Sequence, residues 1–352
     1  MRIAIVKLSS LGDVIHALPV AHALRRRFHD AELTWVAEAR EAPLLAGHPD
    51  LDRVLIVDTR RWRRLIRTRS GAGQVRREVG QLVGDLRAAR FDVALDLQGL
   101  IKSGLLTAST RAPVRVGFAL RHLREPLNAL FTNRRVSPPP EAVHVVEQYL
   151  ALLAPLGITD RQPVFNVPVS GEAERRVGAF LAEEGMKPDD RLVALNPGAG
   201  RPEKRWPVEH WQRLADRLAL EGGVRLVIPW GPGEEGLAEA LSRGLPVRPV
   251  AVPPTTLHEL AALLRRVALA VAADTGPLHL AAALGTSCLG LYGPTSAARN
   301  GPYGARCRAL ESPGRVMATL QPGAVFRAIL ELLATSGFAH GDGVARGPGG
   351  VA

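Results

Sequence analysis

The sequence predicts an α/β protein built from two doubly wound domains, and three observations carry this prediction. Short apolar runs that end in turn residues alternate with longer stretches of helical periodicity, which is typical of βαβ units on a parallel sheet. This alternation occurs twice, before and after residues 165–175. With 352 residues, of which 46% are hydrophobic, the chain is long enough to form two cores. We therefore expect a first domain over residues 1–170 and a second over residues 171–335.

The first domain opens with a strand and a helix. The apolar run at residues 3–8 predicts the strand, and apolar residues at three- and four-residue spacing from Val14 to Phe28 predict the helix. Pro19 must lie in the first turn of this helix or kink it. Further strands of this domain are expected at residues 33–37, 53–57, 93–97 and 114–117.

The second domain repeats the alternation. Its strands are expected at residues 192–196, 225–229, 268–272 and 288–292, with helical segments between them. Beyond residue 335 the sequence is rich in glycine and has few large apolar residues. We therefore expect residues 336–352 to form a disordered tail.

Positive charge is concentrated in the first domain. The formal net charge is +11, and residues 1–170 hold 25 Lys and Arg against 16 Asp and Glu, while the remainder holds 20 against 18. This asymmetry predicts an anionic partner for the first domain: nucleic acid, anionic lipid or an acidic substrate. No apolar run approaches the roughly 18 residues of a membrane span, and no signal-peptide pattern opens the chain, so we expect a cytoplasmic protein. Cys288 and Cys307 lie outside any C-x-x-C pair, so neither a disulfide framework nor a zinc site is expected.

In open α/β sheets ligands bind at the carboxyl ends of the strands, so the loops that follow strands are the expected ligand sites. The loop after the first strand reads Ser9-Ser10-Leu11-Gly12-Asp13. Gly12 allows a tight turn. Asp13 either complements the positive end of the helix dipole or serves as a catalytic carboxylate in a cleft, and the residues alone leave both interpretations open.

The loop at residues 197–207 follows another strand. Gly198 and Gly200 allow backbone amides to approach a ligand, and Lys204 and Arg205 supply positive charge to a bound anion. The spacing differs from that of a P-loop, which disfavours ATP hydrolysis of that kind. A plain basic surface loop is the alternative.

The stretch at residues 273–285 places Asp-Thr-Gly-Pro between a strand and a helix. Pro277 fits the first helical turn, which leaves the amides near Thr275 and Gly276 free to bind a phosphate. Asp274 would then face the sugar hydroxyls of the ligand. His279 is either a helix residue that packs inside or a ligand contact.

Residues 231–236 match G-x-G-x-x-G after a strand, which suggests a dinucleotide site. The match is weak, because the motif lies late in the chain and no acidic residue occurs from Ala240 to His258. Glu234 or Glu235 can still bind ribose hydroxyls at this strand end.

Two polar features lie in the basic first domain. Six arginines occur within residues 60–69, a charge run that most often forms a solvated face. The loop at residues 96–103 carries Gln98 and Lys102 near the expected cleft. The stretch that holds the arginines contains Trp62 almost alone among aromatic residues, which disfavours a nucleic-acid surface.

Together these stretches resemble the lipopolysaccharide heptosyltransferases of glycosyltransferase family 9, and within that family heptosyltransferase I. The resemblance rests on KLSSLGDVIHALP at 7–19, DLQGLIKS at 96–103, PGAGRPEKRWP at 197–207 and ADTGPLHLAAALG at 273–285, followed by LYGPT at 291–295. These motifs span nearly the whole chain in order, and the ordered set is far more specific than any one of them.

The resemblance implies a GT-B fold, in which two Rossmann-like domains face a central cleft. The first domain would bind the acceptor, and the second would bind the nucleotide sugar. The implied reaction is an inverting transfer of heptose from ADP-heptose to a Kdo hydroxyl of lipid A, without a metal or another cofactor. Asp13 matches the family's general base, and inversion needs a base on the face opposite the leaving group.

The remaining site residues follow from the same match. Lys204 would bind the diphosphate and, with Asp13, count as catalytic. The expected donor-binding residues are Gly198, Ala199, Gly200, Lys204, Glu235, Thr255, Asp274, Thr275, Gly276 and His279. The expected acceptor-binding residues are Ser10, Gly12, Arg60, Arg61, Arg63, Arg64, Gln98, Lys102, Arg121 and His144. Glu234 is the alternative to Glu235 at the ribose, and Ala199 and Gly200 replace two hydroxyl residues of some relatives.

We further expect a monomer at the cytoplasmic face of the inner membrane, where the arginine patch contacts anionic lipid, and we expect no nucleic-acid partner. Heptosyltransferase II, which adds heptose to heptose, is the nearest alternative. An NAD-dependent oxidoreductase and a basic nucleic-acid-binding protein are the more remote alternatives.

Overall fold

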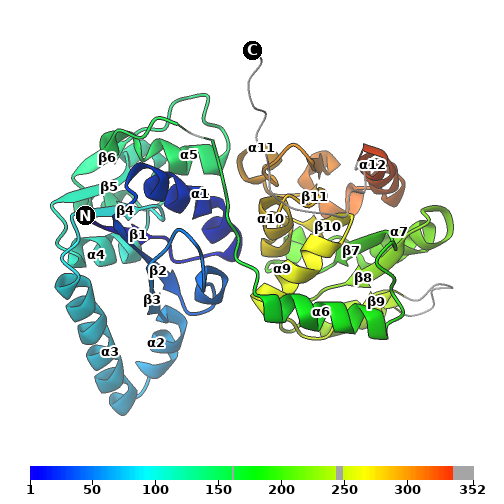
Figure 1. Cartoon of the computed structure of the whole chain (residues 1–352), viewed down its shortest axis with the longest axis horizontal. Helices are drawn as coiled ribbons and strands as arrows, with labels where there is room; N and C mark the ends of the chain where they lie inside the picture. Colours follow the sequence, from blue (N-terminus) through cyan, green and yellow to red (C-terminus); the bar gives the residue numbers. More distant parts are fainter. Residues whose placement is uncertain (161, 243–248, 336–352) are drawn as a thin grey trace.

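The computed structural model describes residues 1–160, 162–242 and 249–335. The tail expected at residues 336–352 lies outside these residues. Two α/β units lie side by side, joined by the segment before α6 (Gly171–Glu183) (Figure 1). Within the described ranges, no helix combines the length and the apolar character that crossing a membrane requires.

The first sheet is parallel and doubly wound. Its strand order is β3-β2-β1-β4-β5-β6. The strands are β1 (Arg2–Val6), β2 (Glu32–Glu38), β3 (Arg53–Val57), β4 (Val93–Asp96), β5 (Val114–Phe118) and β6 (Arg134–Val136). The order reverses between β1 and β4, so the loops after these two strands lie at a switch point where ligands bind.

The second sheet repeats this plan with the order β12-β11-β10-β7-β8-β9. The strands are β7 (Leu192–Asn196), β8 (Arg225–Ile228), β9 (Val250–Ala251), β10 (Leu269–Ala273), β11 (Cys288–Tyr292) and β12 (Cys307–Glu311). Here the order reverses between β7 and β10. The loop at residues 197–207 and the Asp-Thr-Gly stretch are therefore neighbours at the second switch point.

Helices cover both faces of each sheet. In the first unit they are α1 (Leu11–Arg27), α2 (Thr59–Leu65), α3 (Arg69–Ala88), α4 (Ile101–Ser109) and α5 (Val145–Ala151). In the second unit they are α6, α7 (Val208–Glu221), α8 (Glu235–Ser242), α9 (Leu257–Arg266), α10 (Gly276–Ala283), α11 (Ala297–Asn300) and α12 (Pro322–Thr335). Short 3-10 helices are η1 (Ala42–Leu45), η2 (Leu120–His122), η3 (Pro126–Phe131), η4 (Ala154–Leu156), η5 (Pro202–Lys204), η6 (Pro313–Arg315) and η7 (Met317–Thr319).

Every strand expected from an apolar run is present. The strands that were not expected are β6, β9 and β12, and each is short or lies at a sheet edge. The sequence of β12 is CRALE, and β6 consists of Arg-Arg-Val, so neither is a continuous apolar run. Pro19 lies in the interior of α1 rather than in its first turn.

The two cysteines face each other across neighbouring strands. Cys288 and Cys307 are paired positions of β11 and β12, and their Sγ atoms lie 3.2 Å apart as free thiols. Sequence spacing alone does not show this contact, because β12 is one of the strands that was not expected.

Candidate active site between the two domains

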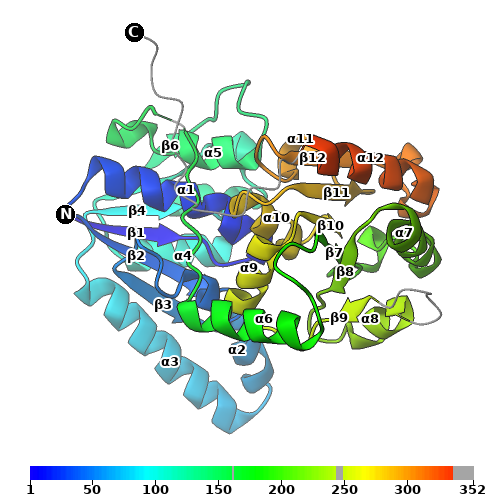
Figure 2. The same ribbon diagram turned by 45° about the vertical axis from the view of Figure 1, so that its right-hand side comes forward.

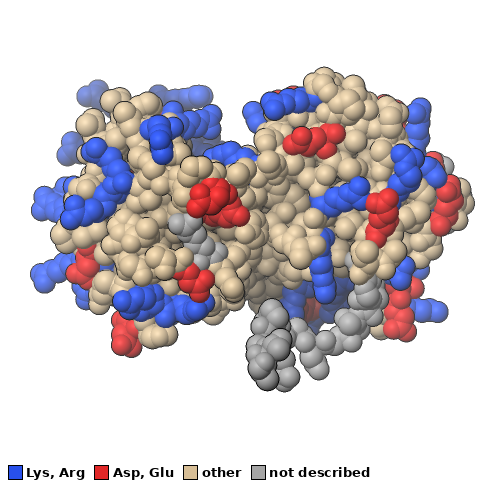
Figure 3. Space-filling model, turned by 90° about the horizontal axis from the view of Figure 1, so that it is seen from above, with Lys and Arg blue, Asp and Glu red and all other residues tan. Residues whose placement is uncertain are grey.

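The N-terminal ends of two helices meet where the domains touch. Helix α1 follows β1 at the first switch point, and α10 follows β10 at the second; α1 and α10 pack against each other (Figure 2). A Cβ atom built on Gly12 would lie 2.6 Å from Cδ2 of His279, and one built on Gly276 would lie 2.6 Å from Cδ2 of Leu11. Glycine at both positions therefore permits this close approach. The space-filling view shows the surface hollowed between the domains (Figure 3).

Substitution of Gly12 tests this contact. We expect Gly12→Ala to weaken the packing of α1 on α10 and to lower activity, because the new methyl group overlaps the His279 ring. Gly80→Ala is the matched control, since a Cβ at Gly80 in α3 meets nothing within 4 Å. The control should gain about 0.5–1 kcal/mol of stability from the better helix former. Thermal unfolding and a transfer assay of both variants check the prediction, which is wrong if Gly12→Ala behaves like the control.

Asp13 lies in the first turn of α1, the helix that follows β1, and its side chain is 39% exposed. Its Oδ2 accepts hydrogen bonds from the backbone N–H of Ser10 at 3.1 Å and from the Ser10 hydroxyl at 2.8 Å. These two bonds hold Oδ2 in place and leave Oδ1 available to other groups. Ser10, which was expected to contact the acceptor, thus orients the expected base.

Two residues that sequence analysis did not assign to the site complete the surroundings of Asp13. Lys7 is almost fully buried, and its Nζ lies 3.8 Å from Oδ1 of Asp13. The same ammonium donates hydrogen bonds to the Tyr149 hydroxyl at 2.7 Å and to the Leu97 carbonyl at 3.2 Å. The Tyr149 hydroxyl in turn lies 3.5 Å from Oδ1 of Asp13. Lys7 and Tyr149 thus hold the free oxygen of Asp13 in place.

The charge state of Asp13 follows from these contacts. Burial raises its pKa, but the Lys7 ammonium and the Ser10 hydrogen bonds outweigh burial, and the net pKa lies below the ordinary value. Burial lowers the pKa of Lys7 and raises that of Tyr149 well above its ordinary value. Asp13 is therefore a carboxylate at neutral pH, as a general base must be.

The second domain contributes an ion pair at its own switch point. Nζ of Lys204 lies 2.5 Å from Oδ2 of Asp274, and Nε2 of His279 lies 3.1 Å from Oδ1 of the same carboxylate. Burial raises the pKa of Asp274, yet His279 and Lys204 together lower it far below the ordinary value. The structure thus brings together three of the expected donor-binding residues. Thr275 occupies the N-cap position of α10 without a capping hydrogen bond from its side chain, and Gly276 begins the helix, so backbone amides of this turn lie beside the ion pair.

The glycine-rich loop of the donor side lies against Glu234, not Glu235. A Cβ atom on Gly198 would fall 2.0 Å from Oε2 of Glu234, and this oxygen accepts the backbone N–H of Gly231 at 2.9 Å. Glu235 is exposed at the first position of α8. The two residues expected as alternatives at the ribose therefore differ in their surroundings: Glu234 lies against the glycine-rich loop, and Glu235 is exposed. In the same loop Ala199 is buried and Gly200 is exposed, and half-buried Thr255 lies between β9 and α9.

Several expected acceptor residues have structural partners. Oε1 of Gln98 accepts the backbone N–H groups of Leu8 and Ser9 and so supports the turn before Asp13. Lys102 pairs with buried Glu38 at 3.1 Å, and Arg61 pairs with Glu78 at 2.8 Å. Each of these three side chains thus has a partner within the first domain.

The other arginines of the expected acceptor site are exposed. Arg60, Arg63 and Arg64 lie on α2, a helix with no fully buried residue. Arg121 is also exposed, and its Nε lies 3.0 Å from Nε2 of His122. In Figure 3, Lys and Arg side chains are spread over the surface of both domains. The basic side chains of α2 remain available to an anionic ligand.

His144 lies in the contact between the domains. Its Nδ1 accepts the backbone N–H of Val146 at 3.2 Å, and its Nε2 lies 2.9 Å from the Gly301 carbonyl of the second domain. The His16 ring stacks edge-on between those of His144 and His279, with centroid distances of 5.3 and 4.3 Å. A cluster of three histidines therefore joins the domains.

The histidine cluster predicts a pH dependence of stability. Burial is the main cause that lowers the pKa of both His16 and His144. The pKa of His144 lies below the ordinary 6.5, and that of His16 lies well below it. His279, Lys7 and Arg299 add to this effect at His16. Because the unfolded chain takes up protons near pH 6.5 and the folded chain does not, the free energy of unfolding should fall as pH drops below about 6.5. Each such histidine lowers the free energy of unfolding by up to about 1.4 kcal/mol for each pH unit of this drop.

Denaturant unfolding at pH 7 and pH 5 measures this slope. His16→Asn should reduce the slope, whereas His29→Asn, on an exposed residue after α1, should leave it unchanged. Equal slopes in the parent and His16→Asn would contradict the prediction.

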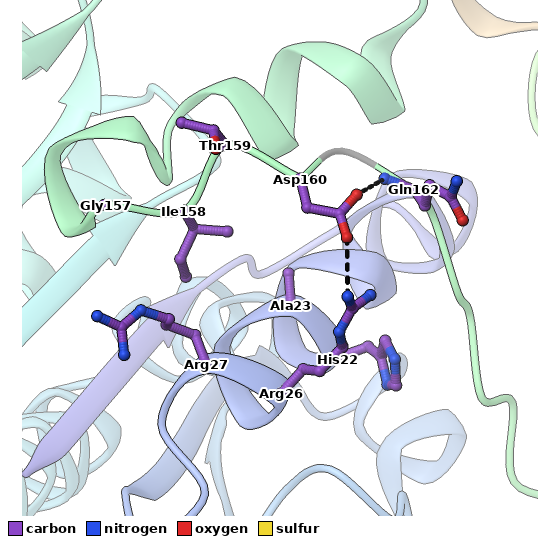
Figure 4. A pocket seen from close by; sticks show the side chains of 9 residues that line it. All are labelled: His22, Ala23, Arg26, Arg27, Gly157, Ile158, Thr159, Asp160 and Gln162. Carbon is purple, nitrogen blue, oxygen red and sulfur yellow. Dashed lines mark hydrogen bonds and ion pairs between the residues drawn. The ribbon is translucent and has the colours of Figure 1, made fainter.

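A separate pocket lies at the opposite end of α1. Its volume is about 310 Å³, and an ion pair between Arg26 and Asp160 at 3.0 Å crosses it (Figure 4). Its lining residues are His22, Ala23, Arg26, Arg27, Gly157, Ile158, Thr159, Asp160 and Gln162. At about 1.5 Å rise per residue, Arg26 is roughly 20 Å along the helix from Asp13. This pocket is not part of the site between the domains.

Comparisons with known proteins agree with this geometry. The model of glycosyltransferase family 9 (heptosyltransferase) matches residues 79–326. Lipopolysaccharide heptosyltransferase 1 of Escherichia coli O18:K1:H7 is 32% identical over 333 residues, which cover 94% of this chain and 98% of that protein. The protein of the same name from Pseudomonas aeruginosa is 35% identical over 310 residues, which cover 86% of this chain and 82% of that protein.

A solved structure gives the same result. The E. coli heptosyltransferase WaaC with ADP-2-deoxy-2-fluoro heptose is 31% identical, has a TM-score of 0.78 and matches over 94% of this chain and 99% of that one. The expected GT-B architecture of two facing Rossmann-like domains is thereby confirmed. The family model covers β4 and the rest of the first domain from residue 79 and most of the second domain, and the similar proteins match over nearly the whole chain. These matches favour a heptosyltransferase over the oxidoreductase and nucleic-acid hypotheses. The chain belongs to glycosyltransferase family 9, the heptosyltransferases.

Proposed function

We propose that this enzyme is a heptosyltransferase I, which transfers L-glycero-D-manno-heptose from ADP-heptose to the Kdo region of lipid A with inversion. The carrying observation is the position of the Asp13 carboxylate at the first switch point, opposite the Lys204–Asp274–His279 group at the second. The proteins of similar sequence that bear the name lipopolysaccharide heptosyltransferase 1 support the choice of reaction.

In this proposal each domain supplies one half of the chemistry. Asp13, ionised and held by Ser10 and Lys7, accepts the proton of the attacking Kdo hydroxyl. Lys204 offsets the negative charge that grows on the departing diphosphate, and the amides at the start of α10 add to this stabilisation. Because the base and the leaving-group site belong to different domains, the nucleophile enters between them from the face opposite the diphosphate.

Asp274 has two roles in the proposal. It holds the Lys204 ammonium at 2.5 Å, so that the cation is in position before the donor binds. Its second oxygen is bound to His279, and a carboxylate so placed can also accept hydrogen bonds from heptose hydroxyls. Glu234, beside Gly198, is our choice for the ribose.

The proposed reaction needs no metal, because Lys204 and the α10 amides supply the positive potential at the diphosphate. We expect the transfer rate to remain within twofold in excess EDTA, measured as ADP release. Loss of activity in EDTA that added Mg²⁺ restores would reject the metal-independent mechanism.

The choice of acceptor is tested with purified enzyme and two substrates. Kdo2-lipid A should be turned over, and its monoheptosylated form should not. Turnover of only the monoheptosylated form would identify a heptosyltransferase II instead. Turnover of neither acceptor, with ADP-heptose bound, would overturn the proposal as a whole.

We also propose that the enzyme works as a monomer at the cytoplasmic face of the inner membrane. The exposed arginines of α2 support contact with anionic headgroups, since the acceptor itself resides in that membrane. Sedimentation with vesicles that contain anionic lipid should exceed that with neutral vesicles, and it should fall at high salt.

A further inference from the structure

Arg299 is a cation of the second domain that neither the motifs nor the proposed mechanism uses. It lies on α11, its side chain is exposed, and its NH1 donates a hydrogen bond to Oδ1 of Asn300 at 2.9 Å. Over residues 1–160, 162–242 and 249–335, no carboxylate pairs with it. An exposed guanidinium without a carboxylate partner is able to bind an external anion.

The backbone that follows Arg299 is fixed against the first domain. The Tyr292 hydroxyl donates to the Asn300 carbonyl at 2.9 Å, and Nε2 of His144 lies 2.9 Å from the Gly301 carbonyl. The Tyr303 ring packs on the His144 ring at a centroid distance of 4.8 Å. This segment of the second domain thus reaches the first domain, and Arg299 is held at the contact.

The charge of Arg299 acts on the group that surrounds Asp13. Burial is the main cause of the lowered pKa of Lys7, and Arg299 adds to it. The guanidinium also opposes the burial effect at the Tyr149 hydroxyl and contributes to the lowered pKa of His16 and His144. All four residues belong to the first domain. Contacts give the same placement: the Gly301 carbonyl just after α11 meets His144, the His144 ring neighbours that of His16, and the His279 ring beside His16 lies against Gly12.

Of the two cations Lys7 and Arg299, only Arg299 is free to bind an anionic ligand. The Lys7 ammonium is already paired with Asp13 and bonded to Tyr149 and Leu97, and it is too buried to meet a ligand. The proposed acceptor carries carboxylates and phosphates. An arginine fork can bind either group with two parallel hydrogen bonds.

We propose that Arg299 binds an anionic group, a carboxylate or a phosphate, of the acceptor beside Asp13. This inference rests on the proposed function. A bound acceptor would then contact the basic side chains of the first domain and Arg299 of the second, so that its binding also holds the domains together. The diphosphate of the donor has the same chemistry, and the experiment separates the two sources.

The test compares Arg299→Gln and Arg299→Lys with the parent enzyme and with Arg327→Gln. Arg327 is exposed on α12, which packs on α7, β10 and β11 rather than on α1, so it matches the change in charge away from the cleft. We expect Arg299→Gln to raise KM for Kdo2-lipid A at least tenfold with kcat within threefold and KM for ADP-heptose unchanged. The KM of Arg299→Lys for Kdo2-lipid A should lie between those of the parent and Arg299→Gln, because lysine retains the charge but lacks the planar guanidinium fork. Arg327→Gln should match the parent.

Direct binding of Kdo2-lipid A in the presence of ADP provides a readout that does not depend on turnover. We expect Arg299→Gln to lose at least tenfold in this affinity and none in affinity for ADP. A rise in KM for ADP-heptose with unchanged acceptor binding would assign Arg299 to the donor, and unchanged values for both substrates would give it no binding role; either overturns the proposal. A parent enzyme that neither binds nor transfers to Kdo2-lipid A would instead refute the proposed function itself.

Discussion

Asp13→Asn should lower kcat by about 10²–10⁴ while affinity for ADP-heptose stays within twofold. This range is the usual contribution of a positioned general base. The amide cannot accept the proton of the attacking hydroxyl, but it has almost the same shape and can keep a hydrogen bond from Ser10. The expected donor contacts lie on the other domain, at Lys204 and Asp274, so donor binding should be preserved. Steady-state transfer and titration with ADP-heptose measure the two quantities.

The controls for Asp13 concern charge and pH. Asp30→Asn removes an exposed carboxylate just beyond α1 and should leave the rate unchanged. Because Lys7 and Ser10 hold the pKa of Asp13 below its ordinary 3.8 despite burial, the base should stay ionised throughout the range in which the enzyme is folded. An Asp13→Asn variant with more than a tenth of the parent rate would remove Asp13 from the mechanism.

The sequence predicted the central strands and the loops of the site for a physical reason. Strands such as β1 and β10 are buried on both faces, so each is a continuous apolar run, and the chemistry-bearing loop must follow its carboxyl end. Edge strands lack this signal. The polar sequence of β12 therefore hid both the strand and the contact between Cys288 and Cys307.

The partners of Asp13 were harder to predict. Lys7 stands within the first motif, but its burial shows only when β1, β2 and β4 surround it. Tyr149 lies 142 residues from Lys7 along the chain, and nothing local to α5 indicates that its hydroxyl meets the ammonium. Which of Glu234 and Glu235 lies against Gly198 depends on the path of the backbone through the turn at Gly233, whose φ is 83°. Contacts of this kind require the folded chain.

Lys204→Met should cause the second large loss, about 10²–10³ in kcat together with weaker binding of ADP. Removal of one preorganised group that stabilises developing charge usually costs this much. Methionine is close to lysine in length and keeps the apolar stem, so the change chiefly removes the ammonium. Arg205→Met is the matched control. Its guanidinium is exposed and donates to the Ala199 carbonyl at 3.1 Å, so we expect less than a tenfold effect.

The same substitution should also destabilise the fold, because it leaves the buried carboxylate of Asp274 with His279 alone. Adding Asp274→Asn to Lys204→Met removes this uncompensated charge. We therefore expect the double variant to regain much of the lost Tm but none of the lost transfer rate. If the rate recovers with Tm, Lys204 serves only to neutralise the Asp274 carboxylate. If neither Tm nor the transfer rate recovers, and the double variant binds ADP normally, the Lys204 ammonium does not face the diphosphate. The loss of rate would then come from the damaged fold.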